Sequence, residues 1–255
     1  MHFYEQVIRQ GLSDHLQDSI LVACGTGGDA KILRSIGFTN VTITNLDKDR
    51  TDGIAPFTWK REDAEALSFP DGSFDWVLVD AGLHHCASPH KAFTEMYRVC
   101  RKGALVLEAR DSLVMRLAVK LGLVPEWEQI AVALTGAGLR AGPIPNYIYR
   151  WTEREVWKTL ESAYPNHAHR LRFFYGMRVP NYRLSMLSPP KRVATLALSY
   201  ALKAFNLVAR RQGNHLGWIA YKTGQLKPWM LPDGLHMRPD YDIGMDPRKY
   251  SGYRE

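Results

Sequence analysis

The sequence has few cysteines and no long uncharged apolar run. Its three cysteines, Cys24, Cys86 and Cys100, are odd in number and have no C-x-x-C spacing, which excludes a disulfide framework and a cysteine zinc site. Glu5 and Arg9 interrupt the first ten residues, so nothing there reads as a signal peptide. With 45% hydrophobic and 23% charged residues, we expect residues 1–255 to form a single ordered cytoplasmic domain.

The charge is distributed unevenly. Residues 1–100 carry a net charge of −5 and residues 101–255 a net charge of +12. This asymmetry suggests a cationic ligand for the first part and an anionic one for the second. The alternative is that the basic surface serves only solubility.

Short apolar runs alternate with helical stretches, the pattern of βα units in a parallel sheet. Strands are predicted at 19–23, 41–45, 57–60, 74–79, 104–108, 171–177 and 216–221, and helices at 29–36, 90–101, 152–162 and 191–211. We therefore expect an α/β, Rossmann-like fold: a seven-stranded, mostly parallel sheet with helices on both faces, a cofactor-binding core at 15–110 and an antiparallel last pair of strands.

Two segments do not follow this alternation. Residues 112–185 are rich in aromatic and basic residues and are predicted to be a substrate-capping insertion over the carboxyl ends of the strands. Arginines suit the capture of an anionic acceptor, and those of this segment include Arg150, Arg154, Arg170, Arg172, Arg178 and Arg183. The proline-containing tail, residues 225–255, is expected to wrap the surface or to be partly mobile.

The apolar helix at 191–211 is too short between its charges to cross a membrane. Basic residues at both of its ends would suit a helix lying on an anionic membrane surface, a peripheral contact. We favour the alternative, a buried helix packed against the sheet.

The turn after the first strand contains Gly25-Thr-Gly27 and opens a helix. Glycine allows a ligand to approach the backbone, and a carboxylate at Asp47, about twenty residues on, meets the spacing for ribose hydroxyls. Gly25, Gly27 and Ala30 also fit G-x-G-x-x-A, so a nicotinamide-dependent oxidoreductase and a purely structural turn both stay open.

An ordered series of motifs distinguishes these alternatives. It consists of Asp63-Ala-Glu-Ala-Leu-Ser-Phe-Pro70, Ser73-Phe-Asp-Trp-Val77, Leu83-His-His85 and Arg98-Val-Cys-Arg-Lys-Gly103. With the glycine turn, over about residues 15–110, it resembles the class I S-adenosylmethionine-dependent methyltransferases, in the small-molecule branch of quinone, sugar and phosphobase enzymes. The resemblance implies S-adenosylmethionine as cofactor, S-adenosylhomocysteine as product and no metal.

Carried over residue by residue, the resemblance implies a cofactor site. Ala23, Cys24, Gly25 and Gly27 would cradle the methionyl part, and Asp47 would hold the ribose diol. Leu46 and Lys48 would flank the adenine, and Asp63 and Ala64 would meet its amine and ring. Asp80 and Ala81 would lie near the sulfonium. The family usually has an acidic residue where this chain has Leu21, so a backbone carbonyl or Asp80 would have to hold the cofactor's ammonium group.

Methyl transfer needs a positioned nucleophile and, where its pKa is high, a base. The stretch Asp80-Ala-Gly-Leu-His84 is similar to the D-A-x-L-H stretch of phosphoethanolamine methyltransferases, whose histidine acts at the transfer site. His84 is therefore the predicted general base, with His85, Glu108 and Asp111 in reserve and Tyr4 as a possible partner. The alternative for His84 is a packed, hydrogen-bonded structural histidine.

The sequence thus predicts an enzyme that O-methylates an anionic small molecule, a sugar or a glycan- or lipid-linked acceptor. A catalytically inactive binding module of the same fold stays open. Nucleic acid is not expected as a partner, because no N-P-P-Y-type loop and no compact Lys/Arg run is present.

Overall fold

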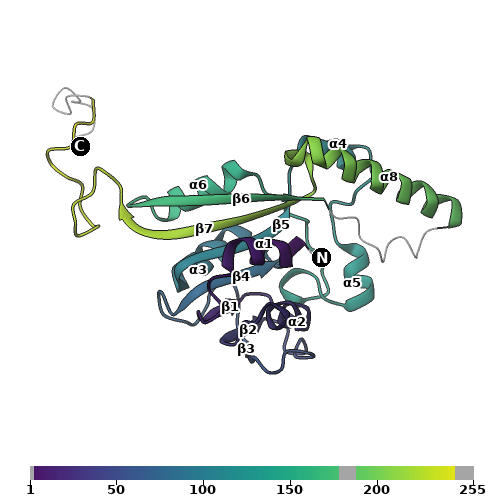
Figure 1. The fold of residues 1–255 in the computed structure, drawn as a ribbon, viewed down its shortest axis with the longest axis horizontal. Helices are drawn as coiled ribbons and strands as arrows, with labels where there is room; N and C mark the ends of the chain where they lie inside the picture. Colours follow the sequence, from purple (N-terminus) through teal and green to yellow (C-terminus); the bar gives the residue numbers. More distant parts are fainter. Residues whose placement is uncertain (1–2, 178–187, 245–255) are drawn as a thin grey trace.

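A computed structural model describes residues 3–177 and 188–244 and contains a seven-stranded sheet (Figure 1). The strand order is β3-β2-β1-β4-β5-β7-β6. The strands are β1 (Ile20–Val22), β2 (Val41–Asn45), β3 (Thr58–Arg61), β4 (Phe74–Asp80), β5 (Cys100–Ala109), β6 (His167–Gly176) and β7 (His215–Leu226). Strands β1 to β5 pair in parallel, whereas β7 runs antiparallel to both β5 and β6. The predicted fold class is confirmed.

Helices cover both faces of this sheet (Figure 1). They are α1 (Phe3–Leu12), α2 (Gly27–Ile36), α3 (Pro89–Val99), α4 (Leu113–Lys120), α5 (Gln129–Thr135), α6 (Glu153–Ala163) and α8 (Pro189–Val208). Single 3-10 turns lie at Leu83–His85 (η1), Leu139–Ala141 (η2) and Arg210–Gln212 (η3). Helix α1 contacts α2 and β7, and α3 contacts α6, β4 and β5.

The alternation of side chains along the strands divides the core into two layers. Ile20 and Val22 of β1 pack with α1 and α2, whereas Leu21 between them packs on the other face with α3 and α6. Leu21, which stands where the resemblance expects an acid, is completely buried there. The cofactor's ammonium group therefore has no carboxylate at this position.

The segment predicted to be the cap has two parts. Residues 113–141 form α4, α5 and η2, none of which the sequence analysis predicted as an element. Residues 153–176 form α6 and β6, which belong to the sheet and its covering layer. The cap is thus shorter than residues 112–185, and Arg178 and Arg183 lie outside the described residues.

The structure bears on two expectations about the end of the chain. Residues 227–244 of the tail stand away from the sheet (Figure 1). Helix α8 is not a buried helix, because its described apolar side chains are exposed, with Tyr200 at 68% and Val208 at 91%. Within the described ranges, no helix is long and apolar enough to span a membrane.

Candidate active site

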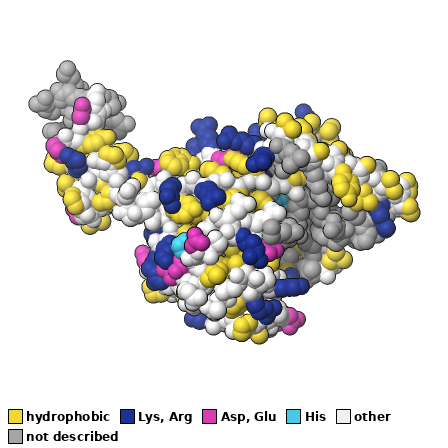
Figure 2. Space-filling view, in the orientation of Figure 1, with side chains coloured by type: hydrophobic (Ala, Val, Ile, Leu, Met, Phe, Trp, Pro, Cys, Tyr) yellow, Lys and Arg dark blue, Asp and Glu magenta, His cyan; other side chains and the backbone are white. Residues whose placement is uncertain are grey.

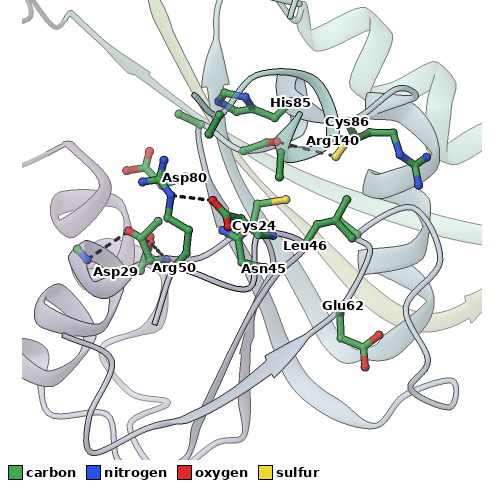
Figure 3. A pocket seen from close by; sticks show the side chains of 18 of the residues that line it. Cys24, Asp29, Asn45, Leu46, Arg50, Glu62, Asp80, His85, Cys86 and Arg140 are labelled. Atoms are coloured by element: carbon green, nitrogen blue, oxygen red, sulfur yellow. Dashed lines mark hydrogen bonds and ion pairs between the residues drawn. The ribbon is translucent and has the colours of Figure 1, made fainter. Parts of the chain in front are cut away.

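A large cavity lies at the carboxyl ends of β1, β2 and β4, where the strand order reverses and ligands bind in open α/β sheets. Its volume is about 760 Å³. Seven of the predicted cofactor residues line it: Cys24, Leu46, Asp47, Asp63, Ala64, Asp80 and Ala81. Figure 3 shows Asp29 and Arg50 on one side, His85, Cys86 and Arg140 on the other, and Cys24 and Asn45 between them.

The remaining four predicted cofactor residues do not line the cavity. Ala23 is buried beneath it and donates its N–H to the Leu78 carbonyl, and the side chain of Lys48 is exposed. Gly25 and Gly27 are required for a different reason from the expected one. A Cβ on Gly25 would lie 2.7 Å from Val22 Cγ1, and one on Gly27 would meet the Asp52 carbonyl oxygen. These glycines make room for the protein's own chain.

Asn45, the last residue of β2, connects the two cofactor loops. Its Nδ2 donates to the Gly25 carbonyl at 3.0 Å, and its Oδ1 accepts from the Asp47 N–H at 2.9 Å. The Asp47 carboxylate then accepts from the Asp49 N–H at 3.1 Å and lies 3.4 Å from Arg50 Nε. The sequence analysis assigned Asn45 to a strand but gave it no role, although its position at the strand end was the available signal.

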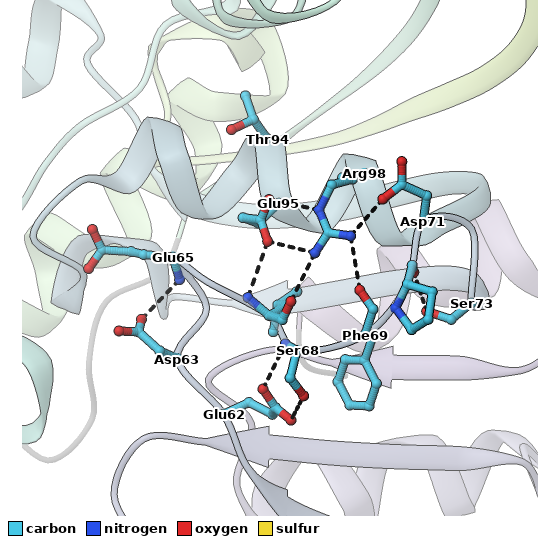
Figure 4. Close-up of polar contacts among 12 residues, drawn as sticks. Glu62, Asp63, Glu65, Ser68, Phe69, Asp71, Ser73, Thr94, Glu95 and Arg98 are labelled. Carbon is cyan, nitrogen blue, oxygen red and sulfur yellow. Dashed lines mark hydrogen bonds and ion pairs between the residues drawn. The ribbon is translucent and has the colours of Figure 1, made fainter.

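The loop that carries Asp63 is held by polar contacts to α3 (Figure 4). Arg98 donates to the Leu67 and Phe69 carbonyl oxygens at 2.9 Å each and pairs with Glu95 and Asp71. The buried carboxylate of Glu65 accepts from the backbone N–H groups of Ala87 and Ser88, just before α3 begins. These contacts fix the loop against both ends of one helix.

Arg140 closes this side of the cavity from the cap. Its Nη2 lies 2.6 Å from Asp63 Oδ2, and its Nη1 lies 3.4 Å from Glu65 Oε2. An adenine amine at Asp63 would therefore share that carboxylate with a guanidinium. Arg140 was not singled out in the sequence, and none of the described arginines predicted for anion capture lines this cavity.

The cavity is predominantly acidic. It is lined by the carboxylates of Glu5, Asp29, Asp47, Glu62, Asp63, Glu65, Asp80 and Glu128, against the basic side chains of Lys31, Arg50 and Arg140. Such a lining favours a cationic ligand and suits a donor that carries a sulfonium and an ammonium group. Asp80 at the end of β4 lines the cavity, and it is the carboxylate that the sequence analysis offered for the ammonium group in place of an acid at Leu21.

The Tyr4 hydroxyl is a buried polar atom of α1. It has no hydrogen-bond partner among the described residues. Burial raises the pKa of Tyr4, and the charges of the cavity-lining Asp29 and Asp80 raise it further. Tyr4 itself does not line the cavity, and no described contact pairs it with His84.

The two histidines of η1 have different environments. His84 is 7% exposed and does not line the cavity, and its Nδ1 lies 2.7 Å from Glu108 Oε2. Its Nε2 lies 3.7 Å from Glu128 Oε1. Burial alone would lower the pKa of His84, but the carboxylates of Glu108 and Glu128 raise it to about 10. A near-neutral pKa, the reason for predicting His84 as the base, is therefore not what the structure gives.

His85 lines the cavity. Burial lowers its pKa and the charge of His84 lowers it further, while Glu128 opposes both. Its Nδ1 lies 3.3 Å from the Gly138 carbonyl oxygen, and its Nε2 lies 3.4 Å from Glu128 Oε2. The carbonyl and the carboxylate both only accept, and the neutral ring has one proton for these two contacts. With that proton on Nδ1, donated to the Gly138 carbonyl, the lone pair is on Nε2.

Asp111, the remaining predicted catalytic residue, lies outside this site. It borders a separate hollow with Arg150 and Tyr147, and its Oδ2 lies 2.8 Å from Arg116 Nη2. Glu108 is instead the carboxylate that holds His84, and Glu128 of the cap was missed because nothing in its sequence neighbourhood marks it.

The ligand atoms of His84, His85 and Glu128 lie within 4.8 Å of one another, close enough to hold a metal ion. The ion pairs with Glu108 and Glu128 already account for the arrangement, so we assign no metal there.

Comparisons with known proteins agree with this geometry. A family model described as a methyltransferase domain matches residues 20–107. The chain is 33% identical over 109 residues to the ubiquinone/menaquinone biosynthesis C-methyltransferase UbiE of Zymomonas mobilis, covering 39% of this chain and 43% of that protein. It is 40% identical over 98 residues to the 2-methyl-6-phytyl-1,4-hydroquinone methyltransferase of Synechocystis, covering 34% and 30%.

The fold also matches solved structures. The YcgJ protein of Bacillus subtilis aligns with a TM-score of 0.52 and 13% identity, covering 87% of this chain and 96% of that one. The matched part of the chain corresponds to less than half the length of the two relatives above. The family model ends at residue 107, before the cap. The predicted resemblance to methyltransferases is confirmed over residues 20–107, and S-adenosylmethionine stays the cofactor that this resemblance implies.

Proposed function

We propose that this chain, which contains a methyltransferase domain of the S-adenosylmethionine-dependent class, transfers the methyl group to a hydroxyl oxygen of a small or lipid-linked acceptor. The observation that carries the proposal is the position of His85, which lies on the wall of the acidic cavity with its Nε2 3.4 Å from Glu128 Oε2. The cofactor supplies an electrophilic methyl group when bound. The protein has to hold the acceptor in line and remove its proton.

In this proposal His85 is the general base and His84 is a positioning residue. The lone pair on His85 Nε2 accepts the hydroxyl proton as the acceptor oxygen attacks. Glu128 Oε2, 3.4 Å away, stabilises the imidazolium that forms. The cationic His84, bracketed by Glu108 and Glu128, keeps Glu128 facing the cavity.

Carbon methylation is the second candidate, favoured by the names of the relatives, which include a C-methyltransferase and a hydroquinone methyltransferase. A base that deprotonates a phenolic hydroxyl would activate the neighbouring ring carbon as well. The lining of the cavity gives little support to an acceptor with an anionic group. Of the described arginines in residues 112–185, Arg140 alone lines the cavity, and its guanidinium is already paired with Asp63 and Glu65.

The product distinguishes the two candidates. The protein is incubated with S-adenosylmethionine carrying a ¹³C-methyl group and a panel of hydroquinones, uronic acids and sugar phosphates, and the products are read by NMR. Methyl signals in the O–CH₃ region are expected. C–CH₃ signals would overturn the assignment to oxygen but leave the transferase, whereas cofactor binding without turnover of any acceptor would favour the inactive binding module.

The role of His85 is tested by pH dependence. As a base with a lowered pKa, His85 is neutral at pH 7, so the rate should be flat near neutrality and fall as the pH drops below 6.5. His85→Gln should lower turnover by roughly 10²–10⁴ and remove the acidic limb, whereas His236→Gln in the exposed tail should change neither. An unchanged profile in His85→Gln would assign the base elsewhere.

A further inference from the structure

Exposed apolar side chains gather on α4, α5, α8 and the residues after α4. Figure 2 shows hydrophobic atoms over α4 and α8. We call this surface the apolar–basic face; its described apolar members are Leu113, Leu117, Leu121, Leu123, Ile130, Leu134, Val193, Tyr200, Phe205 and Val208. Large apolar side chains on several neighbouring elements mark an interaction surface, whereas single exposed ones do not.

Helices α4 and α8 of this face are neighbours in the fold. Ser112 Oγ donates to the Gln212 carbonyl at 3.1 Å, and the Val114 N–H donates to Gln212 Oε1 at 3.4 Å. These bonds join the beginning of α4 to η3, which follows α8. On α8 the exposed positions 193, 196, 197, 200, 204 and 208 recur every three or four residues, so they form one stripe along the helix.

The segments that carry α4 and α8 are basic in sequence. Residues 112–125 and 188–213 together contain seven lysines and arginines and no aspartate or glutamate, whereas Glu126 and Glu128 precede α5. Arg210 and Lys120 are exposed at the ends of their helices, beside the apolar side chains. Asp111, at the edge, is paired with Arg116. An apolar stripe with basic flanks matches the interface of an anionic bilayer, where apolar side chains enter the acyl boundary and cations meet phosphate groups.

The face is also connected to the active site through α5. Glu128, immediately before α5, and Gly138, shortly after it, line the cavity near His85, whereas Ile130 and Leu134 of the same helix are exposed. One short segment therefore has one side at the site and the other on the apolar–basic face.

We propose that the apolar–basic face docks on an anionic lipid surface and that the acceptor reaches His85 from that surface. The second part rests on the proposed function; the docking itself does not. No helix in the described part of the chain crosses a membrane, so the attachment would be peripheral.

Co-sedimentation with vesicles tests the docking. The full chain is mixed with vesicles of phosphatidylglycerol and phosphatidylcholine, or of phosphatidylcholine alone, at low and high salt. We expect binding to the anionic vesicles that weakens with salt. The double variant Leu117→Asp/Val208→Asp should bind roughly tenfold or more weakly. Leu235→Asp, an equally exposed leucine in the tail, should bind as the unchanged protein does.

Three outcomes would overturn the proposal: no binding to either vesicle, equal binding by the double variant, or a dimer in light scattering that Leu117→Asp/Val208→Asp dissociates while vesicles are not bound. The last would assign the face to a second copy of the chain. S-adenosylhomocysteine binding, measured on the same samples, separates the two proposals. Vesicle binding without cofactor binding would refute the proposed function and leave the docking intact.

Discussion

Asp47 is the residue whose position should contribute most to cofactor affinity. It lies at the end of β2 on the cavity wall, and the Asn45 side chain holds its backbone. Its carboxylate contacts the Asp49 N–H and, at 3.4 Å, Arg50 Nε, so lone pairs are left for two ribose hydroxyls. A charged acceptor of two hydrogen bonds is worth more than a neutral one.

Asp47→Ala should therefore weaken binding of S-adenosylhomocysteine by roughly ten- to a hundredfold, measured by calorimetry. Asp49→Ala removes a carboxylate two residues away that does not line the cavity. This variant should bind S-adenosylhomocysteine with the affinity of the unchanged protein. Equal affinities of the two variants would refute the assignment of Asp47 to the ribose.

Individual residues also show where inference from the sequence stops. That Asp47 lines the cavity was predictable from its place at a strand end after the glycine turn, whereas Asp63 and Asp80 were predicted from the resemblance. The reason for a glycine at position 25 was not predictable. From the sequence alone, the absence of a Cβ could make room either for a ligand or for a neighbouring side chain. The two adjacent histidines could not be distinguished, since their pKa values depend on Glu108 and Glu128, which are distant in the chain.

Helix α3 acts as a support for the cofactor loop. The planar guanidinium of Arg98 reaches two carbonyl oxygens of that loop and two carboxylates at once, a set of contacts that the single ammonium of lysine cannot reproduce. Losing it would leave the Leu67 and Phe69 carbonyl oxygens without these donors and the loop carrying Asp63 less restrained.

Arg98→Lys is expected to lower the free energy of unfolding by about 1–3 kcal/mol and to weaken cofactor binding. Chemical denaturation and calorimetry measure the two effects. Arg238→Lys alters an arginine that pairs with Asp240 in the exposed tail, and both quantities should stay constant there. A stable Arg98→Lys protein with full affinity would show that α3 does not restrain the loop.

The regular elements of the sheet were predictable because their apolar runs have a clear period and clear boundaries. Helix α8 was expected to be buried, but its sequence pattern does not decide this. A helix rich in apolar residues has the same pattern whether it packs on a protein core or lies on a lipid surface. Helices α4 and α5 were missed because they are short and expose apolar residues, so the usual contrast between a buried and a solvated face is absent.

Considered as a whole, the molecule separates its charges. The acidic part surrounds the cavity, and the basic excess lies largely in the cap, α8 and the later strands. The two parts meet at the buried group of Glu108, His84 and Glu128, where the cap joins the sheet domain. This group should couple the stability of the whole fold to pH.

The expected pH dependence follows from the directions of the two pKa shifts. The folded pKa of His84, about 10, is above its usual 6.5, so its stabilisation is fully present below pH 6.5 and is lost as pH rises through 10. The close contact with His84 lowers the pKa of Glu128 from 4.5 to about 2, so that contribution is present above pH 4.5 and is lost as pH falls through 2.

The difference in unfolding free energy between the unchanged protein and His84→Gln should therefore be largest between pH 4.5 and 6.5 and shrink toward pH 10. Urea denaturation at a series of pH values measures it. A difference that does not vary with pH would mean that His84 is held by packing and not by its charge.

Titration calorimetry of the purified, folded chain with S-adenosylhomocysteine is the most direct measurement, with NADH as the comparison ligand. Saturable uptake of one S-adenosylhomocysteine per chain, with no heat from NADH, is the predicted result. A folded protein, verified by circular dichroism, that takes up neither S-adenosylhomocysteine nor S-adenosylmethionine would contradict the assignment of the cavity.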